Sequence, residues 1–219
     1  PMFAAWAGAT VVTGVFAGLL GLGILRMKGH YFAVGSIAIV EILRLVAGSW
    51  SGLTGGGEGL NVPILQGGPD FAGRFFLAAM MVVMILAFIM TVLVDRSRLG
   101  FGLRCIAQNE DAADMVGIDV VRYKTIAFTL SAIFCGTIGA IGASWTSYID
   151  PSDSFSILTT LKVPVMVLLG GAGTILGPII GAAVFIVVEL VVWAQFLDFN
   201  RAALGIVIVL LIFFLPGGL

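Results

Sequence analysis

Long apolar runs alternate with short polar stretches along most of the chain. A helix needs about 20 apolar residues to cross the hydrocarbon core of a membrane, and 75–94 and 125–145 contain no Asp, Glu, Lys or Arg. Spans are expected near 4–25, 31–47, 75–94, 125–145, 158–172, 176–196 and 202–216. The pattern therefore predicts an all-α fold, a polytopic transmembrane helix bundle with about seven spans in a single transmembrane domain over 1–219.

The fifth of these spans has a second interpretation. Lys162, Pro164 and the Gly-rich stretch at 170–173 interrupt its apolar pattern. A half-helix fits the same residues, provided that protein or a water-filled cavity covers its backbone. The sequence leaves both interpretations open.

Composition supports the membrane assignment and excludes other classes. The chain has 219 residues, of which 60% are hydrophobic and 11% charged, and its mean hydropathy is +1.15. A net charge of −1 argues against a nucleic-acid partner, which requires a basic surface. Cys105 lies in a polar loop and Cys135 within a span, so neither a disulfide nor a zinc site is expected.

Lys and Arg are distributed unevenly between the loops. Segments 26–30 and 95–124 contain most of them, whereas 48–74, 146–162 and 197–201 contain one each. Because cytoplasmic loops are enriched in positive charge, 95–124 is assigned to the cytoplasm.

The stretch 95–124 is dense in charge but locally balanced, unlike a polybasic lipid-binding segment. Asn109 is suited to cap a short helix, with Glu110 and Asp111 in its first turn and Gly117 just beyond its end. The sequence predicts this helix at 110–116, and a second one at 99–107. Because so short a helix does not persist alone in water, packing against a neighbour is expected.

The span after this loop contains two adjacent rows of small residues. Ala132, Gly136, Ala140 and Ser144 form one row at a spacing of four, and Cys135, Gly139, Ala143 and Ser147 form the next. Small residues let helix backbones approach closely. Gly136, Gly139 and Ala140 are therefore candidates for helix packing or for a moving interface along a transport pathway.

Besides Lys162, three charged residues fall inside expected spans. Glu41 and Arg44 lie three apart on one helical face and are expected to neutralise each other, as a structural pair or as a polar element of a pathway. Glu189 has no basic residue within four positions, so it is expected to face the bundle or a membrane surface.

The sequence contains little that would support a catalytic function. The Gly-rich runs at 54–59 and 170–177 lack the Gly-Lys-Ser/Thr of a phosphate-binding loop, so the chain is not expected to hydrolyse ATP. A flexible turn and a docking surface for an external binding protein are both open for 54–59. His30 is the only histidine and is placed at a helix boundary, so no catalytic triad or metal site is expected.

Several motifs together resemble a known family. They are Arg104-Cys105-Ile106-Ala107-Gln108-Asn109-Glu110-Asp111-Ala112-Ala113, Gly117-Ile118, Arg122-Tyr123-Lys124, Glu41-Ile42-Leu43-Arg44-Leu45, Gly170-Gly171-Ala172-Gly173-Thr174 and Leu215-Pro216-Gly217-Gly218-Leu219. The chain resembles the permeases that import branched-chain amino acids through ATP-driven transporters, in particular the second permease type of the pair. Family members usually carry a basic residue where Gly217 or Gly218 stands, and they extend further at the N-terminus.

The resemblance implies a function and a set of partners. Two ATP-binding-cassette ATPase subunits would bind ATP and engage the loop through Arg104, Asn109, Glu110, Asp111, Ala112, Ala113 and Gly117. A second homologous permease and an extracytoplasmic substrate-binding protein would complete an importer in a bacterial or archaeal plasma membrane, and the chain itself would bind no cofactor. An ion-coupled secondary transporter is the alternative, favoured by broken helices and intramembrane carboxylates.

Overall fold

The computed structural model describes residues 2–27, 30–62, 69–171 and 173–195. The chain divides into two compact units, Pro1–Ser154 and Phe155–Leu219, here called unit 1 and unit 2. Each unit is described by itself.

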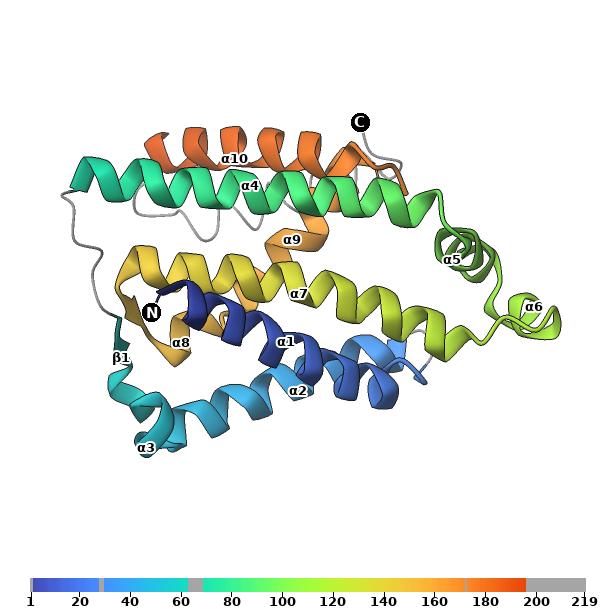
Figure 1. Cartoon of the computed structure of the whole chain (residues 1–219), viewed down its shortest axis with the longest axis horizontal. Coiled ribbons are helices and arrows are strands. Elements are labelled where there is room, and N and C mark those ends of the chain that lie inside the picture. The colour runs from blue at the N-terminus through green and yellow to red at the C-terminus, as the bar shows by residue number, and fades with distance from the viewer. Residues whose placement is uncertain (1, 28–29, 63–68, 172, 196–219) are drawn as a thin grey trace. The chain divides into compact units, whose positions relative to one another are not determined.

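Helices account for most of the described residues (Figure 1). Unit 1 contains α1 (Met2–Ile24), α2 (His30–Ser49), α3 (Ser51–Thr54), the 3-10 turn η1 (Gly56–Glu58), β1 (Leu60–Asn61), α4 (Pro69–Asp95), α5 (Arg98–Gln108), α6 (Glu110–Met115), α7 (Val120–Thr146), β2 (Tyr148–Ile149) and α8 (Pro151–Ser154). Unit 2 contains α9 (Ile157–Gly170) and α10 (Gly177–Gln195).

Six of the expected spans coincide with helices, and the seventh, 202–216, lies outside the described residues. Within the described part of the chain, four stretches are long and apolar enough to cross a membrane: Met2–Ile24, Asp70–Asp95, Val120–Thr146 and Pro151–Gly170. The polytopic all-α fold is therefore confirmed. At 14 residues, α9 alone is about 21 Å long, shorter than the roughly 30 Å of hydrocarbon.

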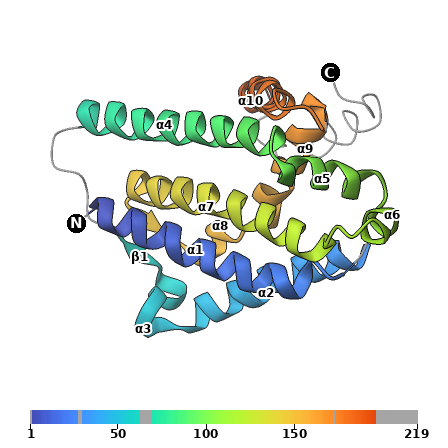
Figure 2. The same cartoon turned by 45° about the vertical axis from the view of Figure 1, so that its right-hand side comes forward.

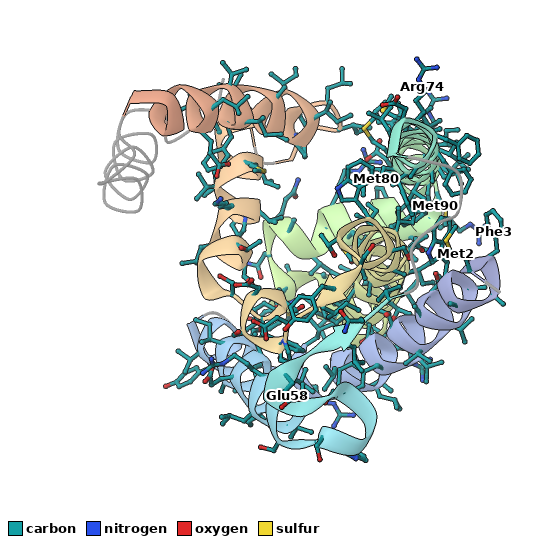
Figure 3. The ribbon with its side chains drawn as sticks, turned by 90° about the vertical axis from the view of Figure 1, so that its left-hand side faces the viewer. Met2, Phe3, Glu58, Arg74, Met80 and Met90 are labelled. Carbon is teal, nitrogen blue, oxygen red and sulfur yellow. The ribbon has the colours of Figure 1, made fainter. Side chains whose placement is uncertain are left out.

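Helices α1 and α7 run side by side in unit 1 (Figures 1 and 2). Their pairing is antiparallel, since Trp6 near the start of α1 donates through Nε1 to Ser144 Oγ near the end of α7 at 3.0 Å. Trp6, Phe76, Val83 and Ile141 form a core that joins α1, α4 and α7. Figure 3 shows Arg74 projecting from α4 on the side opposite α7, while Met2 and Phe3 begin α1.

The two ends of unit 1 are built differently. At one end, β1 pairs with β2 in an antiparallel ladder, Leu60 opposite Ile149, so the loops that follow α2 and α7 share one side. At the other end, Leu25 and Arg26 line a cleft with residues of α6 and the start of α7, so the segment after α1 shares a side with α5 and α6. This agrees with the predicted alternation, in which 26–30 and 95–124 face the same compartment.

The Gly-rich run 54–59 is a packed turn. Gly55, Gly56 and Gly59 have positive φ, and a Cβ at Gly59 would lie 2.5 Å from the carbonyl oxygen of Ile149. Tyr148 also donates its hydroxyl to the Glu58 carbonyl at 2.8 Å. Hydrogen bonds and close backbone contacts therefore hold this turn.

Candidate functional site

The short helix of the charged loop forms where the sequence predicts it. α6 covers Glu110–Met115, and the Asn109 side chain accepts from the backbone N–H groups of Asp111 at 3.0 Å and Ala112 at 3.1 Å. The Asn109 cap is thus confirmed. The preceding helix, α5, covers Arg98–Gln108 and matches the predicted 99–107 within one residue at each end.

The end of α6 has the hydrogen bonds of a Schellman motif. The N–H of Gly117 donates to the Asp114 carbonyl at 2.9 Å, and that of Ile118 to the Ala113 carbonyl at 3.0 Å. Gly117 has φ +88°, the left-handed region that favours glycine. A Cβ there would meet nothing within 4 Å, so backbone conformation selects this glycine.

Two features hold α6 against the rest of unit 1. Glu110 forms an ion pair with the Lys124 ammonium of α7, with the side chains 33% and 23% exposed respectively. Ala113 is buried at 4% exposure, whereas the neighbouring Ala112 is exposed. A six-residue helix is unstable in isolation, and these contacts with the two caps account for its presence.

α5 is joined to both long helices beside it. Arg104 donates to the carbonyl oxygen of Asp95 at 2.9 Å and pairs with its carboxylate at 3.3 Å, at the end of α4. A Cβ at Gly102 would lie 2.3 Å from the Tyr123 ring of α7. The α4–α5–α6–α7 segment is therefore a continuous packed corner and not a loose loop.

The outer surface of α6 is apolar at its tip and acidic beside it. Met115 is 90% exposed and Val116 82%, and both Asp111 and Asp114 are exposed. A cleft of about 180 Å³ lies between α6, the start of α7 and Arg26. The end of α6 therefore presents two exposed apolar side chains next to exposed carboxylates.

The two rows of small residues on α7 differ in their contacts. A Cβ at Gly136 would lie 2.6 Å from Thr13 Oγ1 of α1, and Ala140 packs against the Trp6 core. Gly139 of the second row is exposed, and a Cβ there would meet nothing within 4 Å. Only the first row thus carries the close contact with α1, so the two rows do not form one interface.

Glu41 and Arg44 pair within α2, as predicted. Arg44 Nε donates to both carboxylate oxygens of Glu41, at 3.1 and 3.0 Å, and Nη2 adds a contact of 2.5 Å to Oε1. The pair spans one helical turn, so each charge is neutralised by its own helix. These hydrogen bonds lie within α2, and over the part of the chain that the structure describes the candidate residues are not gathered into one site.

One interhelical ion pair was not predicted from the sequence. Lys162 Nζ of α9 lies 2.5 Å from Glu189 Oε1 of α10. Sequence spacing placed no base near Glu189 because its partner is 27 positions away. The only available signal was that Lys162 and Glu189 are the sole charged residues between 157 and 195.

Comparison with known proteins identifies the relatives of the chain. A family model described as "Branched-chain amino acid transport system / permease component" matches residues 1–215. The chain is 29% identical over 238 residues to the high-affinity branched-chain amino acid transport system permease protein LivM of Salmonella typhimurium, covering 96% of this chain and 55% of that protein. It is also 29% identical to LivM of Escherichia coli, covering 92% and 53%.

A further relative has another transport role in its name. The autoinducer 2 import system permease protein LsrC of an Enterobacter species is 28% identical over 83% of this chain and 52% of that protein. The chain spans about half the length of the curated relatives that it matches. No solved structure matches it.

Proposed function

Because the chain belongs to the branched-chain amino acid transport permease family, we propose that it is a membrane-spanning subunit of an ATP-driven importer for branched-chain or related amino acids. The supporting observation is α6. This helix is capped at both ends, paired to α7 through Glu110 and Lys124, and exposes Met115 and Val116.

α6 is proposed to be the contact through which ATPase closure reaches the membrane helices. A push on its exposed tip would be carried by Ala113 and the Glu110–Lys124 pair into α7, and from α7 through Gly136 to α1. The tip fits an apolar depression with a basic residue at its rim, since the exposed Asp114 lies beside it. In this scheme ATP supplies the energy difference between two access states, and the chain transmits it.

The remaining partners follow from the same proposal. Two ATPase subunits would bind ATP, a second related permease would complete the pathway, and an extracytoplasmic binding protein would deliver the amino acid. The assembly would lie in a bacterial or archaeal plasma membrane. The chain would need no cofactor and carry out no chemical reaction.

Co-purification of the full-length protein with the products of neighbouring genes tests this assignment. Recovery of ATPase subunits and a second permease, with ATPase activity stimulated by a leucine-loaded binding protein, is the expected result. Recovery of the chain alone, with uptake that persists after ATP depletion, would favour the secondary-transporter alternative.

The double variant Glu110→Lys with Gly117→Val tests α6 itself. The first change places two ammonium groups together at Lys124, and the second puts a β-branched residue at φ +88°, at a cost of about 1–2 kcal/mol. The protein should insert and fold, while ATP hydrolysis no longer drives uptake. ATPase activity and leucine uptake, measured on the same proteoliposomes, separate these effects.

Matched controls exist in the same loop. Arg122→Glu reverses a charge in the exposed Asp119–Arg122 pair, whose Arg122 side chain is 80% exposed. Gly117→Asn replaces the glycine with a residue that also adopts the left-handed backbone conformation. Both should transport nearly as well as the unaltered protein, and normal uptake by the double variant would rule out α6 as the coupling element.

A further inference from the structure

Unit 2 contains a hairpin whose two helices carry one charge each. α9 and α10 are antiparallel, because Gly170 contacts Gly177 and Gly181 at one end while Lys162 reaches Glu189 further along. Lys162 and Glu189 are the only charged residues from 157 to 195. Glu189 lies about 18 Å along α10 from its start, within an apolar stretch.

A charge at such a position is costly. An isolated Lys or Asp at the centre of a membrane helix costs about 2.5–3.5 kcal/mol on insertion scales. Their contact at 2.5 Å offsets part of this cost, and the side chains stay 28% and 20% exposed. The two charges therefore neutralise each other yet remain partly accessible.

The hairpin is packed by other means. A Cβ at Gly181 would lie 2.0 Å from the Met166 carbonyl oxygen, so the backbones already touch. Val165, Leu169 and Phe185 are buried at 6%, 3% and 1% exposure. Because an apolar pair often replaces a buried ion pair without loss of stability, packing alone gives no reason for Lys162 and Glu189.

We propose that Lys162 and Glu189 bind the two charged groups of the transported amino acid, an inference that rests on the proposed import function. The α-carboxylate would accept hydrogen bonds from Lys162 Nζ and the α-ammonium would donate to the Glu189 carboxylate. One ion pair would thus be exchanged for two, with no proton transferred.

This arrangement differs from the other ion pair within an apolar helix. Glu41 and Arg44 lie on one helix and make three hydrogen bonds to each other, so a ligand that entered between them would have to break all three. Lys162 and Glu189 come from two helices and are joined by one hydrogen bond, from Lys162 Nζ to Glu189 Oε1. A zwitterion can insert between them with a small separation of side-chain ends.

The test uses the whole transporter, purified with its ATPases and second permease but without the binding protein. Binding of radiolabelled leucine is measured in competition with 3-methylbutylamine, which lacks the carboxylate, and 4-methylpentanoate, which lacks the amine. Each analogue should compete at least about tenfold more weakly than leucine, because one charged hydrogen bond is lost. Competition by either analogue as strong as that of leucine itself, or no leucine binding at millimolar concentration, would overturn the proposal.

Variants separate binding from structure. Lys162→Met and Glu189→Gln should each weaken leucine binding at least about tenfold, while Arg74→Gln, which removes an exposed charge on α4, should leave it unchanged. The exchanged variant Lys162→Glu with Glu189→Lys restores an ion pair and should assemble with basal ATPase activity, yet bind leucine as weakly as the single variants. Full recovery of leucine binding in the exchanged variant would show that the ion pair only holds α9 to α10 and does not bind the amino acid.

The two proposals fail in different ways. If the complex assembles with ATPases and imports leucine while the Lys162 and Glu189 variants bind it normally, only the binding site is wrong. If no ATPase co-purifies, the proposed import function is wrong.

Discussion

The α1–α7 pair of unit 1 and the α9–α10 pair of unit 2 both contain glycines, but their helices approach in different ways. Where α1 meets α7, a side chain lies against the glycine: Gly14 lies against Ile133, Gly21 against Thr125, and Gly136 against Thr13. Where α9 meets α10, glycine lies against backbone, with Gly170 against both Gly177 and Gly181. A side chain can shift to admit a methyl group, whereas a peptide carbonyl cannot. Replacing a glycine with a larger residue should therefore destabilise the α9–α10 interface more than the α1–α7 interface.

The largest effect is expected at Gly181. A Cβ there would lie 2.0 Å from the Met166 carbonyl oxygen and 2.6 Å from the Gly170 nitrogen. Gly181→Val should separate α9 from α10 and destabilise the protein by more than about 3 kcal/mol, the upper range for overpacking. Unfolding in mixed micelles, followed by titration with SDS, measures the loss.

The control for this prediction lies on the same helix. Ala183→Val introduces the same side chain at an exposed position and should change the unfolding free energy by less than about 0.5 kcal/mol. Equal stability of the two valine variants would show that the α9–α10 contact is looser than described.

A smaller effect is expected at Gly136 of α7. Its Cβ would lie 2.6 Å from Thr13 Oγ1 and 2.7 Å from Thr13 Cβ, contacts that a shift of Thr13 partly relieves. Gly136→Ala should destabilise by about 1–3 kcal/mol. Gly139→Ala, three positions away and with nothing within 4 Å, should be neutral or stabilising by up to about 1 kcal/mol. If Gly139→Ala is the more damaging change, the second row carries the interface instead.

Local features were predictable from the sequence and long-range pairings were not. Apolar runs and the Asn109–Gly117 spacing gave the helices and caps, because a cap depends on residues within one turn. Two rows of small residues predicted close packing, but their periodicity could not tell that Gly136 faces α1 and Gly139 does not. The Lys162–Glu189 pair depends on how α9 folds back on α10, which no local spacing encodes.

The smallest effect is expected from the hydrogen bonds between uncharged side chains that join α1 to α7. Trp6 Nε1 donates to Ser144 Oγ at 3.0 Å, and the hydroxyls of Thr10 and Thr137 lie 2.9 Å apart. Interhelical hydrogen bonds in membrane proteins average about 0.6 kcal/mol. Ser144→Ala should cost more than this average, about 1–2 kcal/mol, because it leaves the N–H of the buried Trp6 without its acceptor.

Thr137→Val is the matched comparison, since it removes a hydroxyl at nearly constant shape and leaves Thr10 bonded to the Trp6 carbonyl at 2.7 Å. Its cost should be near or below the average, and the same SDS titration measures both variants. A larger loss of unfolding free energy for Thr137→Val than for Ser144→Ala would mean that the threonine pair contributes more than the Trp6–Ser144 hydrogen bond to the packing of α1 on α7. In either case both losses should remain below that of Gly181→Val, because a hydrogen bond can be replaced by a neighbouring group and overlapping backbone atoms cannot.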